Sequence, residues 1–165
     1  MELTTDIYLR GTAWNKAIEH LSDIFAPRTN YMVYMLSLAI GIMYDERIEM
    51  LSEDNDGVKS VPRNVLHNND NGKLDFMFQA AILSTTTEKL LEDERLELAF
   101  GEKNEFNKIG FLTQFANFGV TKLVELIGDN TVESMVQIKN FLFSTVEGRN
   151  LEIDSLPDDL LLEEI

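Results

Sequence analysis

Apolar residues recur at intervals of three to four positions along most of the chain, and this spacing is typical of amphipathic helices. The stretch "FNKIGFLTQFANFGVTKLVEL", Phe106 to Leu126, shows it most clearly, and Gly128 follows where a helix often ends. The stretch "YMVYMLSLAIGIMY", residues 31–44, is apolar nearly all round, which predicts a helix at the centre of the core. This central helix is predicted to begin after a cap at Thr29 or Asn30 and to run to Met50. The same periodicity predicts four further helices: Thr12 to Phe25, Leu74 to Ser84, a helix from a cap at Thr87 to Phe100, and Asn130 to Gly148.

Turn-forming residues interrupt this pattern most strongly between Ser52 and Lys73. The segment contains an Asp-Gly step, an Asn-Gly step and Pro62, so it is predicted to be the longest irregular segment. Strand signals are nearly absent, although "VKSVPRNVL" could form a short extended piece or hairpin that Pro62 would keep at an edge. The pattern therefore predicts an all-α fold, a single compact bundle of five to seven helices with one long irregular loop.

Length and composition fit one domain, which we place at residues 1–148, followed by an acidic C-terminal tail at 149–165. The chain has no cysteine, which excludes disulfides, thiolate nucleophiles and Cys-ligated metals. The N-terminus lacks the apolar run of a signal peptide, and the longest apolar stretch is shorter than the ~20 residues that span a bilayer. We expect a cytoplasmic protein without membrane association.

The balance of charges is strongly acidic, with 29 acidic against 14 basic residues and a formal net charge of −15. Such a charge repels phosphate backbones, so direct nucleic-acid binding is not expected. Three interpretations stay open. The charge could serve solubility alone, it could favour docking on a basic protein, or it could belong to an inhibitor that imitates DNA.

Motifs for catalysis and metal binding are missing. A calcium loop counted from Gly57 or Gly72 as its sixth residue lacks the Glu required at position twelve. His20 and His67 do not have zinc-ligand spacing, and there is no phosphate-binding loop or nucleophile elbow. We therefore predict no catalytic, cofactor-binding or metal-binding residue and no enzyme activity. The alternative is a small enzyme that uses the loop with Arg63 and His67, which would require a pocket that gathers them.

The step Asn117, Phe118, Gly119 stands out inside the most regular predicted helix. A helical Gly costs about 1 kcal/mol relative to Ala but lets another backbone come close, and a semi-buried Asn must find partners for its amide. One interpretation is a tight helix crossing in which Asn117 holds a loop such as that around Arg63 and Asn64. The other is a notch that binds a partner.

Four blocks carry a resemblance to a known family: "YMLSLAIGIMYDER", "PRNVL", "LDFMFQAAILST" and "EFNKIGFLTQFANFGVTKLVELI". With their pattern of apolar residues around Ala39, Gly41, Arg63, Asn117 and Gly119, they resemble the small accessory proteins associated with the Dnd DNA-phosphorothioation restriction system. The resemblance covers roughly residues 28 to 145 and leaves out the first predicted helix and the tail. It implies a phage-defence accessory role alongside larger DNA-acting proteins, and it brings no active residues to carry over.

The tail ends in "LPDDLLLEEI", which puts leucines and an isoleucine beside acids in a segment too short to fold alone. It could dock as a helix in a partner's groove, form a strap on its own domain or fray.

We therefore predict a non-enzymatic interaction subunit of a bacterial phage-defence or DNA-modification-linked restriction system. Its partner would be a larger protein, with a DNA-processing protein as one option, and a homo-oligomer stays open. The alternative from another class is an acidic DNA-mimic inhibitor. The candidate partner-binding residues are Arg63, Asn64, Asn117, Phe118, Leu160, Leu161 and Ile165.

Overall fold

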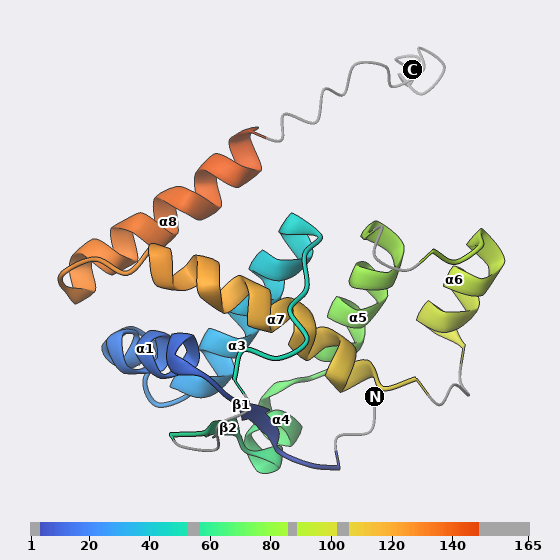
Figure 1. Ribbon diagram of the computed structural model, residues 1–165, viewed down its shortest axis with the longest axis horizontal. Coiled ribbons are helices and arrows are strands. Elements are labelled where there is room, and N and C mark those ends of the chain that lie inside the picture. The colour runs from blue at the N-terminus through green and yellow to red at the C-terminus, as the bar shows by residue number, and fades with distance from the viewer. Residues whose placement is uncertain (1–3, 53–56, 86–88, 102–105, 149–165) are drawn as a thin grey trace, which may run out of the picture.

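The computed structural model describes residues 4–52, 57–85, 89–101 and 106–148. These residues form eight helices and one two-stranded sheet, so the fold is mostly helical, as predicted (Figure 1). In chain order the elements are β1 (Ile7–Leu9), α1 (Thr12–His20), α2 (Ser22–Phe25), α3 (Thr29–Tyr44), β2 (Lys59–Val61), α4 (Arg63–Asn69), α5 (Lys73–Ser84), α6 (Glu92–Phe100), α7 (Lys108–Glu125) and α8 (Thr131–Gly148).

Helices α3 and α7 cross at the centre of the molecule and form its most extensive helix pair (Figure 1). Each contributes a glycine to the crossing. A Cβ on Gly119 would overlap the carbonyl oxygen of Ser37, and a Cβ on Gly41 would overlap that of Phe115. The two backbones thus approach so closely that no side chain fits at either position. The predicted close approach at Gly119 is therefore present, and α3 is the helix that makes it.

A hydrogen-bonded aromatic group joins α1 to this crossing. Trp14 is fully buried, its ring stacks on Tyr34 with centroids 6.3 Å apart, and its indole N–H donates to Asn117 Oδ1 at 3.0 Å. The Tyr34 hydroxyl lies 3.3 Å from Thr113 Oγ1, which already donates to the carbonyl of Ile109, so Tyr34 is the donor of the pair. Burial raises the pKa of Tyr34.

The small sheet corrects the sequence prediction in two places. Strand β1 was not predicted, and it pairs antiparallel with β2 so that Ile7 lies opposite Val61. Strand β2 lies within "VKSVPRNVL", where a short extended piece was expected, but the same predicted irregular segment also contains the helix α4. The strand pair buries Ile7, Leu9 and Val61, and this burial holds the N-terminal segment against the core.

The helix boundaries also differ from the predicted ones. The helix predicted over 12–25 is two helices, because the chain breaks at Leu21 between α1 and α2. The second predicted helix ends at Tyr44 rather than Met50, since Asp45 adopts a left-handed backbone with φ of 55°. Eight helices within the described ranges exceed the predicted five to seven, because the four-residue α2 and the seven-residue α4 are too short for periodicity to detect.

Helices α6 and α8 lie at opposite edges of the molecule (Figure 1). Helix α6 packs mainly against α5, and α8 contacts α2 beside the central pair. Among the described residues, no helix is both long and apolar enough to cross a membrane.

Candidate functional site

The structure places Arg63 and Asn64 at the start of α4, where both side chains are exposed. The backbone N–H of Arg63 donates to Asp6 Oδ1 at 2.8 Å, so this turn is anchored to the segment before β1. His67 lies one turn further along α4 and is also exposed. No hollow described below includes any of these side chains, and within the described ranges no three His, Asp or Glu side chains gather as a metal site.

Asn117 lies buried at the helix crossing, and three partners within the chain satisfy its amide. Its Oδ1 accepts from Trp14, and its Nδ2 donates to the carbonyl oxygens of Ile48 and Glu49 at 3.1 and 3.3 Å. Asn117 therefore holds the segment after α3 onto α7, rather than the loop around Arg63 that the sequence suggested. With 7% of its surface exposed, it offers little to a partner.

Phe118, the next residue, lies beside Tyr44 at the end of α3. Its ring lies tilted against Tyr44 with centroids 5.7 Å apart, and Tyr44 in turn stacks on Phe141 of α8 at 6.5 Å. This row of three rings joins α7, the end of α3 and α8. In the structure Phe118 thus helps to seat α8. The other three candidate residues, Leu160, Leu161 and Ile165, lie outside the described residues.

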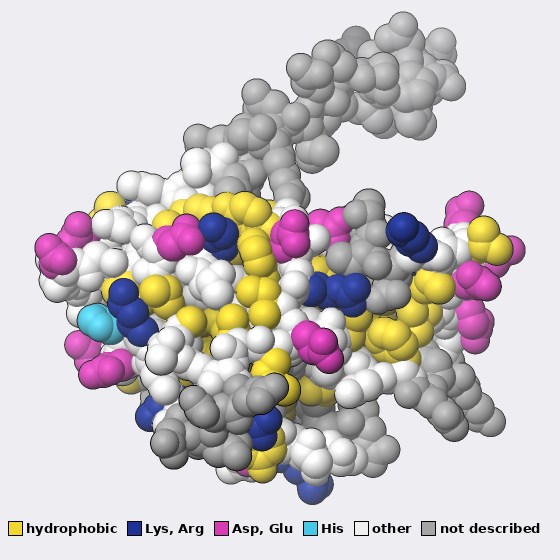
Figure 2. Space-filling model, in the orientation of Figure 1, with side chains coloured by type: hydrophobic (Ala, Val, Ile, Leu, Met, Phe, Trp, Pro, Cys, Tyr) yellow, Lys and Arg dark blue, Asp and Glu magenta, His cyan; other side chains and the backbone are white. Residues whose placement is uncertain are grey.

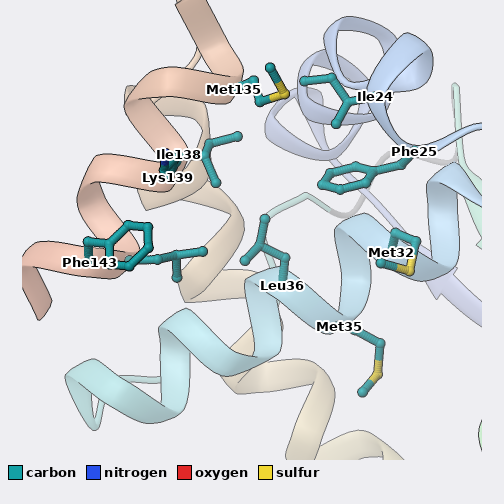
Figure 3. Close-up of a pocket in the computed structure, with 10 residues that line it drawn as sticks. Ile24, Phe25, Met32, Met35, Leu36, Met135, Ile138, Lys139 and Phe143 are labelled. Atoms are coloured by element: carbon teal, nitrogen blue, oxygen red, sulfur yellow. The ribbon is translucent and has the colours of Figure 1, made fainter. Parts of the chain in front are cut away.

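An apolar hollow on the described surface was not predicted from the sequence. It is a groove of about 660 Å³ between α2, α3 and α8, which we call the α8 groove. Figure 3 shows Phe25, Leu36 and Ile138 directed into the space between the three helices. The lining residues are Ile24, Phe25, Met32, Met35, Leu36, Met135, Ile138, Lys139, Leu142 and Phe143.

The groove exists because α8 carries more apolar surface than the body covers. Ser134 and Ile138 are buried against the body, and Phe141 stacks on Tyr44. With a rotation of about 100° per residue, Met135 and Leu142 lie beside this seated face, and they stay 51% and 40% exposed. A helix that packs along only part of its apolar arc leaves the remainder open at the surface.

Hydrogen bonds at the start of α8 fix its direction. Asn130 Oδ1 accepts from the backbone N–H of Glu133 at 2.9 Å, as the predicted cap at Asn130 requires. Ser134 Oγ accepts from the N–H of Gly128 and donates to the carbonyl of Asn130. The backbone N–H groups of Gly128 and Glu133 in the turn between α7 and α8 therefore have hydrogen-bond partners. This turn sets the angle at which α8 flanks the groove.

The chemistry of the groove is that of a binding surface. Lys139 is its one charged side chain, and its ammonium lies 5.6 Å from the centre of the Phe143 ring. The other nine lining residues are apolar, and three of them are methionines, whose flexible side chains adapt to different partners. Lys139 is the one titratable side chain of the lining, so the surface that the groove presents is almost wholly apolar.

A second, smaller hollow of about 240 Å³ lies at the start of α7. The Arg47 guanidinium covers two rings there, 5.0 Å from the centre of Phe111 and 5.6 Å from that of Phe115. Asn107 is the cap of α7, since its side chain accepts from the N–H of Gly110. Arg47 and Asn107 thus contact the first turns of α7, and we assign this hollow a structural role.

The acidic charge is distributed unevenly. Thirteen of the 29 acidic residues fall in segments 1–3, 53–56, 86–88, 102–105 and 149–165, and the described residues carry sixteen acidic against twelve basic ones. Figure 2 shows Asp and Glu in small separate groups with Lys and Arg among them on the face in view. Among the described residues on that face, Figure 2 shows no continuous row of carboxylates, which a DNA mimic would need.

Comparisons with protein-family models, with curated proteins and with solved structures found no match for this chain, so the resemblance to the Dnd-associated family stays a prediction from the sequence blocks.

Proposed function

We propose that this chain is a non-enzymatic binding subunit that holds an amphipathic helix of a larger protein in the α8 groove. The observation that carries the proposal is the groove itself, an apolar hollow with one lysine in which Met32, Met135, Leu142 and Phe143 are 39 to 55% exposed. Apolar side chains gathered in this way at a surface typically mark an interaction site.

The form of the groove favours a helix over a small molecule. A small-molecule site usually encloses most of its ligand and presents several placed polar groups, whereas this groove is open and offers only Lys139. Recognition of a helix in a groove needs a row of apolar contacts for residues spaced three and four apart. Walls made by helices α2, α3 and α8 supply such a row.

The charge of the whole chain adds a requirement on the partner. A net charge of −15 attracts a protein with basic residues and speeds its approach through long-range steering. We therefore propose a partner helix with an apolar face and lysines or arginines beside it. On the sequence resemblance alone, we place this partner in a Dnd-linked restriction system of phage defence.

The absence of cysteine makes a direct test practical. A Met135→Cys variant carries one benzophenone-maleimide at the groove, and a matched Phe76→Cys variant carries it on the exposed surface of α5. After illumination in an extract of the native host, we expect the label at position 135 to join one protein through an amphipathic helix, identified by mass spectrometry. The label at position 76 should not join that protein.

A second pair of variants tests the contribution of the groove. With an affinity tag on the full chain as the means of capture, Met135→Ser combined with Phe143→Ser should reduce capture of that protein at least tenfold, because both side chains line the groove. Phe76→Ser combined with Leu96→Ser changes two equally exposed apolar residues elsewhere and should leave capture unchanged. Equal capture by both double variants would rule out the groove as the binding site.

A further inference from the structure

The described residues leave the α8 groove open, and the chain itself contains a segment suited to cover it. We propose that the tail segment Leu156 to Ile165 docks in the α8 groove of its own chain and competes there with the partner helix. The competition rests on the proposed function, whereas the docking does not.

The position of the tail brings it within reach. Helix α8 ends at Gly148, five residues after Phe143 in the groove lining. At 1.5 Å per residue, Met135 at the other end of the lining lies about 20 Å from Gly148. Residues 149–159 can span roughly 36 Å when extended, so Leu160 can reach every part of the groove.

The chemistry of the segment matches that of the lining. Its apolar residues are Leu156, Leu160, Leu161, Leu162 and Ile165, and they fit a surface made of nine apolar side chains. Four acids lie among them, at 158, 159, 163 and 164. One of these carboxylates can pair with Lys139, the single charged group of the lining, while the others stay in water.

Attachment to the same chain favours the tail over a second copy of the protein. A segment joined by a short linker has an effective concentration of about a millimolar, so a weak contact is enough to fill the site. Two copies would each bring a net charge of −15 and would lose the freedom of independent motion on association. Residues 149–165 carry a net charge of −5 and residues 1–148 one of −10, so the body repels its own tail less than it would repel a second whole chain.

Disulfide trapping in the full chain tests the docking. We expect a Met135→Cys, Leu161→Cys variant to form an intramolecular disulfide on mild oxidation with copper phenanthroline, read as a faster monomer band on a non-reducing gel. The matched Phe76→Cys, Leu161→Cys variant should stay mostly reduced. Adding Leu160→Ser and Ile165→Ser to the first variant should lower its disulfide yield at least fivefold, because the docking contacts are lost.

Two results would overturn the inference: similar yields from the 135 and 76 positions, or disulfide-linked dimers in place of monomers, which would show a second copy in the groove. Fluorescence of the single tryptophan verifies that each variant is folded.

The two proposals can fail separately. If the benzophenone at position 135 captures a partner but no internal disulfide forms, tail docking is wrong and the proposed function stands. If the disulfide forms and no partner is captured, the proposed function is wrong and tail docking stands. Where both hold, locking the tail through the disulfide between positions 135 and 161 should reduce the amount of the identified partner in an affinity pull-down at least tenfold, and a reductant should restore it.

Discussion

At the scale of single residues, Asn117 shows what local sequence can and cannot predict. An Asn among the apolar residues of a helix must have partners for its amide, and this need was clear from the sequence. The partners themselves were not, because Trp14 lies 103 positions earlier and the carbonyls of Ile48 and Glu49 belong to an irregular segment. A helical period describes which side a residue faces, but not which distant groups meet it there.

Replacing this side chain should therefore weaken the fold. We expect Asn117→Ala to lower the free energy of unfolding by about 2 kcal/mol, because the indole N–H of Trp14 and two carbonyls lose their partner. Urea unfolding followed by Trp14 fluorescence gives the value directly, since this is the single tryptophan. The control Asn64→Ala removes an exposed amide and should change the free energy by less than about 0.5 kcal/mol. Equal effects would contradict the assigned hydrogen bonds.

Tyr34 gives a prediction about pH. Its pKa is raised by burial, so above about pH 10 the unfolded chain loses the phenolic proton while the folded chain keeps it. The contribution of Tyr34 to stability is thus complete below pH 10 and declines as the pH rises further. Between pH 9 and 11 we expect the free energy of unfolding of the wild type to fall more steeply than that of Tyr34→Phe. Parallel curves from urea unfolding would show that burial of this phenol does not couple to folding.

At the scale of elements, the long helices were predictable and the short ones were not. Helices α5 and α8 agree closely with their predicted ranges, because their apolar pattern extends over three or more turns. Strand β1 has three residues, and its place in the fold depends on β2, about 50 positions away. Such an element is stabilised by tertiary pairing, which no local window contains.

The helix crossing makes the sharpest prediction at this scale. Gly119→Ala should lower the free energy of unfolding by about 3 kcal/mol, because the new methyl group would overlap the carbonyl of Ser37 and force α3 and α7 apart. In the control Gly110→Ala, on the same helix, the atoms nearest to the new methyl belong to the side chain of Asn107, so the loss should be limited to that cap, about 1 kcal/mol. Thermal or urea unfolding distinguishes the two.

Helix α8 should respond very differently to changes on its two apolar sides. We expect Ile138→Ala to increase amide hydrogen exchange along α8 by one or two orders of magnitude, because it removes about 2 kcal/mol of packing from the seated side. Phe143→Ala, on the groove side, should change exchange less than threefold. If both variants loosened α8 equally, Phe143 would belong to the core and the groove would not be an open surface.

At the scale of the whole molecule, composition predicted the net charge but not where the charged side chains lie on the surface. The sequence predicted an acidic protein, and the structure adds that acidic and basic side chains lie among one another on the described face in Figure 2. The groove escaped prediction for a related reason. It is formed by α2, α3 and α8 together, and the pattern of any one helix does not say which part of its apolar surface stays open.

Charge and groove should then affect different steps of partner binding. We expect Asp158→Asn, Asp159→Asn, Glu163→Gln and Glu164→Gln together to reduce the salt dependence of the association rate for the captured partner, since tail charges act through steering. Met135→Ser with Phe143→Ser should instead speed dissociation, because contacts in the groove are lost. Stopped-flow mixing at 50 and 500 mM salt separates the rates, and a change of salt dependence in the groove variant would contradict this division.

The central pairing of α3 with α7 also has a consequence during synthesis of the chain. Glu125, where α7 ends, follows the end of α3 by 81 residues. At 5 to 20 residues per second, the apolar α3 waits roughly 4 to 16 s for the helix that covers it. The nascent chain therefore emerges from the ribosome with its most hydrophobic segment uncovered, and this segment is where a chaperone would bind first.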